Sequence, residues 1–115
     1  MAKTLIMLVR VLGLAAIIVG ILLWVTSKRP YFWPHIGLGS CVAAAVFVMA
    51  VLAMIKGDVV AGVAGLLLAI LLPLVGFMQL PLVFHAMGAV QAAHIALGLS
   101  AIGLAERLYS AIRRV

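Results

Sequence analysis

The sequence contains very little charge and almost no acid. Charged residues make up 9% of the 115 positions, and Asp58 and Glu106 are the only acidic side chains. A soluble domain of this length needs far more polar surface to cover its core, so that class of protein is excluded. With two acids and no Ser-His-Asp set, the chain also lacks candidate residues for hydrolysis or group transfer.

Cysteine is nearly absent as well. The single Cys41 excludes an intrachain disulfide.

The net charge of +6 is explained by basic residues that flank the membrane segments and contact anionic lipid headgroups. We therefore expect no nucleic-acid partner.

Long apolar runs take the place of the missing polar residues, and 69% of the residues are hydrophobic. A bilayer-spanning helix needs about 20 largely apolar residues, and the sequence offers four such segments. Tight turns are expected at Lys56-Gly57-Asp58 and at Gln79-Leu80-Pro81. We predict an all-α, integral membrane four-helix bundle that forms one domain over residues 1–115. The spans are expected at about residues 5–26, 35–55, 59–80 and 82–112.

The basic residues indicate the orientation, because cytoplasmic flanks of membrane proteins are rich in Lys and Arg. Four spans place both termini on one side. One face would then carry most of the basic residues: Lys3, Arg10, Lys56, Arg107, Arg113 and Arg114. We expect both termini to lie in the cytoplasm, with the chain in the bacterial inner membrane and the lipid bilayer as its main partner.

A short motif occurs twice. His35-Ile-Gly-Leu-Gly39 is repeated as His94-Ile-Ala-Leu-Gly98, once in the second expected span and once in the fourth. These spans run in the same direction through the membrane. Two hairpins related by a pseudo-twofold axis along the membrane normal would bring the two motifs face to face.

Two imidazoles that face one another inside a membrane favour a metal centre. Haem iron takes nitrogen ligands above and below the ring, and the macrocycle needs an apolar slot between helices. Imidazole supplies those ligands without adding charge to the lipid interior. Gly39 and Gly98 lie one turn beyond their histidines, where small residues let a flat ring approach the helix backbone. The motif therefore predicts non-covalent haem b with His35 and His94 as the metal ligands.

Membrane depth distinguishes the histidine pairs. Two axial ligands must lie at nearly the same depth, and a helix rises about 1.5 Å per residue. His35 lies about 31 Å from Lys56, and His85 would match it if the fourth helix reached the membrane boundary at Glu106. If that helix continues to Arg113, His94 lies about 28 Å from its end and matches instead.

We favour the longer fourth helix, because it also explains a second pair of residues. It places Glu106 inside the membrane at the same depth as Arg10, which lies in the first span. Two buried charges of opposite sign at one depth compensate each other. His35 and His94 then become the ligand pair, and His85 becomes an interfacial residue.

Several residues allow a second interpretation. Either histidine could fasten the bundle through a hydrogen bond, without any cofactor. Gln91 and Gln79 could orient an imidazole or bind a quinone oxygen, although helix packing explains them equally well. We expect Gly13, Gly20, Gly62, Gly65, Gly76 and Gly88 to be close-packing points between helices. Glycine-rich faces would also suit a homodimer.

Part of the sequence resembles a group of small bacterial four-helix membrane proteins whose function is not assigned. The resemblance covers most of the chain from His35 to Glu106. It depends on the residues around His35 with Leu38-Gly39, Leu72-Pro73, Gly76-x-x-Gln79, Gln91-x-x-His94, Gly98 and Gly103-Leu-Ala-Glu106.

More distantly, histidines paired across a four-helix membrane bundle resemble the b-type cytochromes of the cytochrome b561 kind. That resemblance implies non-covalent haem b, single-electron transfer and a redox partner, with a quinone as one candidate. The chain departs from the larger cytochromes because it has too few histidines for an obvious second haem. It also lacks the Cys-x-x-Cys-His motif of c-type haem attachment.

The sequence fits two other classes of small membrane protein less well. A small multidrug-type antiporter has this length, but the acidic residue expected in its first span is missing, and Arg10 lies in that region. Fluoride-channel-like proteins carry a polar motif with Asn that this chain lacks. A haem-free accessory subunit of a larger membrane complex remains as an alternative. We expect an electron carrier rather than a catalyst.

Overall fold

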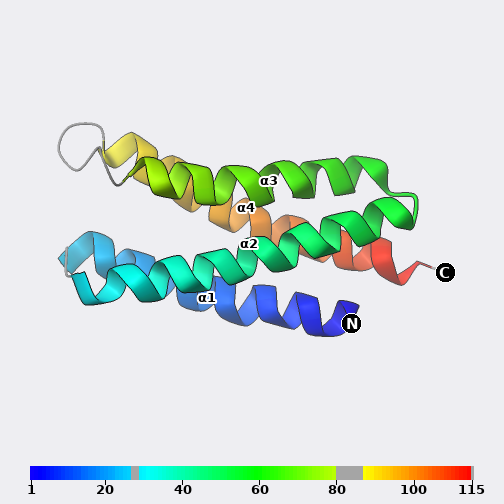
Figure 1. Ribbon diagram of the computed structural model, residues 1–115, viewed down its shortest axis with the longest axis horizontal. Coiled ribbons are helices and arrows are strands. Elements are labelled where there is room, and N and C mark those ends of the chain that lie inside the picture. Colours follow the sequence, from blue (N-terminus) through cyan, green and yellow to red (C-terminus); the bar gives the residue numbers. More distant parts are fainter. Residues whose placement is uncertain (27–28, 80–86, 115) are drawn as a thin grey trace.

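The computed structural model describes residues 1–26, 29–79 and 87–114, and within them four long helices account for nearly all of the structure (Figure 1). These are α1 (Ala2–Thr26), α2 (Phe32–Ile55), α3 (Val59–Met78) and α4 (Met87–Arg113), with a short 3-10 helix, η1 (Arg29–Tyr31), before α2. Each long helix has the length and apolar composition to cross a membrane. The expected all-α, multi-pass four-helix bundle is confirmed.

The helix ends differ from the predicted spans by a few residues. α2 begins at Phe32 rather than at His35, because Pro34 falls in its first turn, where the missing N–H is tolerated. α4 continues to Arg113, as the longer prediction required. Its expected start at Leu82, like the rest of the turn after Gln79, lies outside the described residues.

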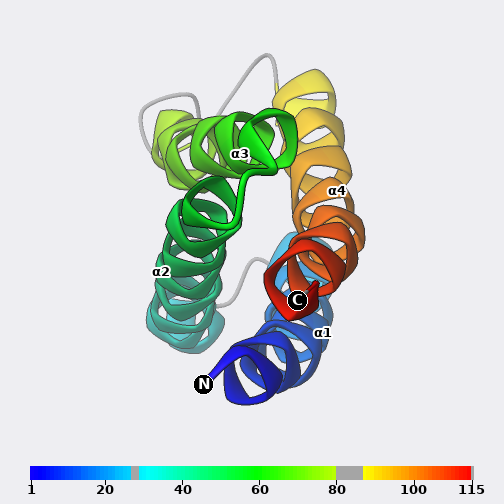
Figure 2. The same ribbon diagram turned by 90° about the vertical axis from the view of Figure 1, so that its right-hand side faces the viewer.

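The helices form two antiparallel hairpins that pack side by side. α1 pairs with α2 and α3 with α4, while α2 contacts α3, α1 contacts α4, and α2 meets α4 across the diagonal. Figures 1 and 2 show both termini at the same end of the bundle as the α2–α3 turn. α2 and α4 therefore run in the same direction, as the pseudo-twofold arrangement requires.

The predicted turn at Lys56-Gly57-Asp58 is confirmed, and each of its last two residues has a specific role. Gly57 has a φ of 93°, in the left-handed region that glycine adopts without strain. Asp58 caps α3, because its carboxylate accepts a hydrogen bond of 3.1 Å from the backbone N–H of Ala61. Arg107 of α4 reaches the same carboxylate at 3.2 Å. The turn thus ties α4 to the start of α3.

The Asp58 cap predicts how stability depends on pH. The pKa of Asp58 lies below its ordinary value, chiefly because the Ala61 N–H bonds the charged form. A lowered folded-state pKa stabilises the protein above the unfolded value of about 3.9, and the effect is lost as pH falls through the lower folded value. We expect Asp58→Ala to lower the thermal unfolding midpoint at pH 7. The difference from the unmodified protein should shrink below about pH 4.

Asp58→Asn is the matched control, because Asn also caps helices but cannot lose a proton in this range. Its unfolding midpoint should lie between those of the unmodified protein and the alanine variant at pH 7. A difference between Asp58→Ala and the unmodified protein that stays the same from pH 7 to pH 3 would contradict the proposed role of the charged cap.

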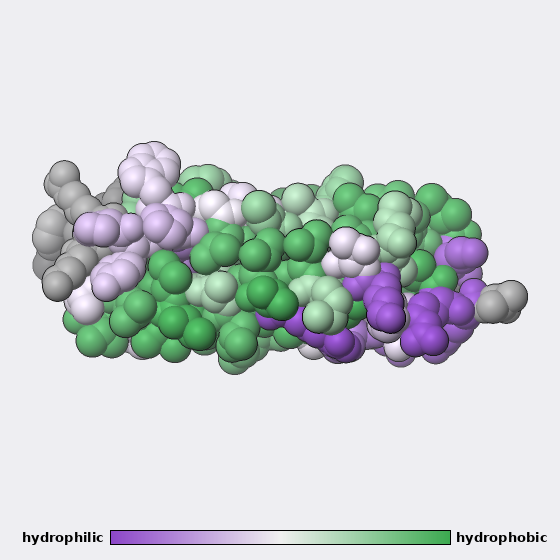
Figure 3. Space-filling view, turned by 90° about the horizontal axis from the view of Figure 1, so that it is seen from below, coloured by the Kyte–Doolittle hydropathy of each residue, from purple (hydrophilic) through white to green (hydrophobic). Residues whose placement is uncertain are grey.

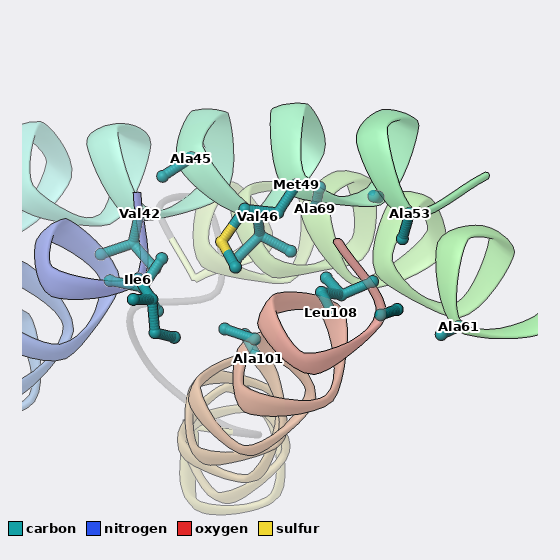
Figure 4. Close-up of a cluster of buried hydrophobic side chains, with 14 of the residues drawn as sticks. Ile6, Val42, Ala45, Val46, Met49, Ala53, Ala61, Ala69, Ala101 and Leu108 are labelled. Carbon is teal, nitrogen blue, oxygen red and sulfur yellow. The ribbon is translucent and has the colours of Figure 1, made fainter. Parts of the chain in front are cut away.

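The buried core occupies the half of the bundle nearer the termini. Eight of the fifteen residues in the core cluster are alanines, so the helix backbones lie close together, as in other membrane bundles. Figure 4 shows Ile6, Met49 and Leu108 filling the space between them. The expected close packing at Gly65 is confirmed, because a Cβ added there would lie 2.8 Å from the Ala50 Cβ.

Gly13 and Gly88 differ in their surroundings. A Cβ added at Gly13 would lie 3.0 Å from the Ile102 side chain, so α1 and α4 do pack closely there. A Cβ added at Gly88, in the first turn of α4, would meet nothing within 4 Å among the described residues, so the described part of the chain does not support close packing there.

Hydrophilic and hydrophobic residues occupy different parts of the surface. Hydrophilic residues gather at the end that carries the termini, and a hydrophobic zone covers much of the remaining length (Figure 3). This end holds Lys3, Lys56, Arg107, Arg113 and Arg114. An apolar zone next to a basic end is the pattern expected of a protein embedded in a bilayer.

The predicted pairing of Arg10 with Glu106 is confirmed. The Arg10 Nε lies 2.7 Å from one carboxylate oxygen of Glu106, and Nη2 lies 2.9 Å from the other. The pair lies at the surface of the bundle, because the two side chains are 48% and 44% exposed. Counting residues places a side chain at a depth, but it does not say which way that side chain faces.

Candidate cofactor site

His35 and His94 meet between the two hairpins. Their ring centroids are 5.8 Å apart, and the ring planes form an angle of 74°. Metal–imidazole bonds are about 2.0–2.1 Å long, so two imidazoles on opposite sides of one metal have centroids roughly 6 Å apart. The structure thus brings together the two histidines that the depth argument paired.

The His35 ring rests on α1. A Cβ added at Gly20 would lie 2.8 Å from His35 Cε1, so the ring occupies the space that any larger residue would fill. Its Nδ1 lies 2.9 Å from the carbonyl oxygen of Ala16. Because a carbonyl only accepts, Nδ1 donates the proton, and Nε2 of the neutral ring keeps its lone pair. This is the state that a metal-binding histidine needs.

The His94 ring rests on α3 in the corresponding way. A Cβ added at Gly76 would lie 3.1 Å from His94 Cε1. The backbone of Leu72 faces the ring, but Nδ1 of His94 is buried and has no hydrogen-bond partner among the described residues. A buried polar atom without a full hydrogen bond is costly, so the His94 ring is held less firmly by its backbone neighbour than the His35 ring.

The two histidine environments repeat one pattern. Ala16 lies four residues before Gly20, and Leu72 lies four residues before Gly76, so each imidazole faces a glycine and the backbone one turn earlier. These glycines were expected to pack helix against helix, but each packs against an imidazole instead. A signal was available, because Val-Gly occurs fifteen residues before His35 at Gly20 and eighteen before His94 at Gly76.

A cavity of about 880 Å³ lies beside the two histidines. Its volume is in the range of sites that hold small molecules and cofactors. All four helices line it, mostly with apolar side chains, and the aromatic residues Trp24, Phe32 and Trp33 lie towards the end away from the termini. The bundle thus has one half filled by small side chains and one half that is hollow.

The other predicted site residues fall into three groups. Gly39 and Gly98 line the cavity, but a Cβ at Gly39 would meet nothing within 4 Å, so neither glycine touches an imidazole as Gly20 and Gly76 do. Gln91 also lines the cavity, together with Gln79. His85 lies outside the described residues.

The donor set limits what the site can bind. The described residues contain no group of three or more His, Cys, Asp or Glu side chains that could hold a metal ion. A metal held by protein side chains alone usually needs three or four ligands. A macrocycle that brings its own nitrogen ligands needs only two from the protein, and His35 and His94 provide two.

Comparison with known proteins does not identify a family, so the fold alone defines the class of this protein. No family model, curated protein or solved structure matches the chain. The chain is therefore a four-helix, multi-pass membrane protein with a paired-histidine cavity between its hairpins.

Proposed function

We propose that this protein binds one haem b between His35 and His94 and carries single electrons in the membrane. The observation that supports this function most strongly is the facing histidine pair beside a large apolar cavity. Histidines that only fasten helices would use their ring nitrogens on neighbours and would need no cavity. Here both imidazoles line the same cavity, which all four helices surround.

The chain's own residues fit this role. Gly20 and Gly76 leave room for the two rings against α1 and α3. The Ala16 carbonyl accepts a hydrogen bond from Nδ1 of His35, which leaves the lone pair of Nε2 for a metal ion. The apolar cavity wall limits the access of water, and the aromatic end suits the membrane interface.

Haem bound there would supply a one-electron couple. If His35 and His94 both held the iron, no ligand position would be left for oxygen, which would favour electron transfer over oxygen binding. A quinone is the class of redox partner that we propose, because the amides of Gln79 and Gln91 line the same cavity and could hydrogen-bond to a quinone oxygen. The basic end of the bundle supports a topology with cytoplasmic termini in a bacterial inner membrane.

Visible absorption of the purified protein tests this function. Protein made in haem-replete cells should be red, with a Soret band and a sharp α-band after reduction. The spectrum should follow the protein through size-exclusion chromatography. A colourless protein that takes up no added haem would overturn the proposal and would favour the haem-free accessory subunit.

A further inference from the structure

The outward face of α4 differs from those of the other helices. α1, α2 and α3 each expose several large apolar side chains, as lipid-facing helices do. Among the described side chains of α4, Leu99 is the only large hydrophobic one that is exposed. The rest of the exposed face is small or polar and includes Ala92, Ala96, Ser100, Gly103, Arg107 and Ser110.

This face is poorly suited to lipid. α4 is the least apolar of the four candidate spans, yet the smallest share of its span is buried within the bundle. A helix that is more polar than its neighbours should be the one most covered by protein, because polar groups in hydrocarbon are costly. The combination indicates that α4 is covered by something other than this single chain.

The Arg10–Glu106 ion pair adds an independent observation. Leu108 packs against Gly65, which lies about 9 Å along α3 from its start, so Glu106 lies within the apolar length of the bundle. The pair is nevertheless about half exposed. Charged residues inside a membrane almost always face protein or a water-filled cavity rather than lipid.

We propose that a second copy of this chain covers the outward face of α4, with the two α4 helices packed in parallel. Both copies have the same orientation in the membrane, so a twofold axis along the membrane normal brings the same face of each together. Ala92, Ala96 and Ser100 recur at intervals of four, which lets two helix backbones approach closely. A Cβ added at Gly103 would meet nothing within 4 Å, so this position is also open to a neighbour.

Charge complementarity favours a second copy as the occupant. The Arg107 side chain contacts Asp58 through one nitrogen and is still 58% exposed. The Glu106 side chain is 44% exposed beside it. Because Glu106 and Arg107 are neighbours in sequence, a parallel twofold pair holds both at one depth, and an Arg107 side chain that reached Glu106 of the partner subunit would make the same contact twice. The face carries both signs of charge, so it is complementary to itself.

Disulfide trapping in membranes tests this interface. Because Cys41 is exposed, the test variants are made in a Cys41→Ser background. Ser100→Cys is then compared with Ile70→Cys, which is on the exposed face of α3. Ser100 and Ile70 match in depth. Gly98 faces Leu72 on the antiparallel helix, and Ser100 and Ile70 each lie two residues from this pair towards the same end of the bundle. After copper-phenanthroline oxidation, most of the Ser100→Cys chain should migrate as a dimer, and most of the Ile70→Cys chain as a monomer.

Three results would overturn the proposal: no dimer with Ser100→Cys, equal dimer with Ile70→Cys, or trapping of Ser100→Cys to a different protein. A second variant gives an independent check. Gly103→Leu places a bulky side chain on the face and should convert the detergent-solubilised dimer to a monomer by light scattering. A dimer that persists in Gly103→Leu would also contradict it. Neither readout depends on haem, so failure of the interface and failure of the proposed function are separable.

Discussion

Replacing His94 with alanine is expected to abolish haem retention. His94 is one of two imidazoles whose rings face each other at a centroid distance of 5.8 Å, and no third histidine, cysteine or acid joins them among the described residues. Loss of one axial ligand leaves haem held by apolar contact and one bond. The absorption of the purified variant should fall to the level of a mock preparation, and His35→Ala should give the same result.

His85→Ala is the control for a general effect of losing a histidine. The depth of His85 in the membrane predicts an interfacial position for it. The haem content of this variant should therefore be close to that of the unmodified protein. Equal haem retention in His94→Ala and His85→Ala would refute the assignment of the ligand pair. Loss of haem in His85→Ala alone would make His85 the second ligand. Circular dichroism of each variant checks that the helices still form.

Replacing Gly20 with alanine is expected to weaken haem binding although Gly20 is not a proposed ligand. The added Cβ would lie 2.8 Å from Cε1 of His35 and 3.1 Å from its Nδ1, so the ring must move away from the Ala16 carbonyl. Loss of such an outer partner typically costs about 10–100-fold in metal affinity. Haem titration should show a loss of this order, with a shift in the midpoint potential of the haem that remains.

Gly37→Ala is the matched control, because it makes the same change two residues from His35. A Cβ at Gly37 meets nothing within 4 Å, and Gly37 does not line the cavity. Its haem affinity and potential should equal those of the unmodified protein. Gly76→Ala should weaken haem binding less than Gly20→Ala, because its added Cβ would lie 3.1 Å from His94 Cε1. Equal affinity in the Gly20 and Gly37 variants would show that the glycine contact does not position the ring.

The sequence predicted the fold and the relative depth of the histidines. Length and apolar composition locate four spans, and helical rise is regular enough that His35 and His94 were paired by counting. The structure places their rings in contact. The same counting predicted that Arg10 and Glu106 meet, and they do.

The direction in which side chains face was much harder to predict. In a soluble helix, the alternation of polar and apolar residues shows which side is buried. In these helices both the lipid and the protein interior are apolar, so the pattern does not distinguish them. For this reason the sequence predicts the depth of Arg10 and Glu106 in the membrane but not their half-exposed position at the surface of the bundle. The contacts of Gly20 and Gly76 with the imidazoles could not be predicted for the same reason.

The ratio of haem to protein in the purified, detergent-solubilised protein tests the central claim most directly. Both histidines come from one chain, and all four helices of that chain line the cavity, so the account predicts one haem b per chain. This ratio should hold whether the chain is a monomer or a dimer, and it should fall to near zero in His35→Ala and His94→Ala. A ratio of one haem to two chains would place haem between subunits, and no haem at all would remove the cofactor. Either result would contradict the account.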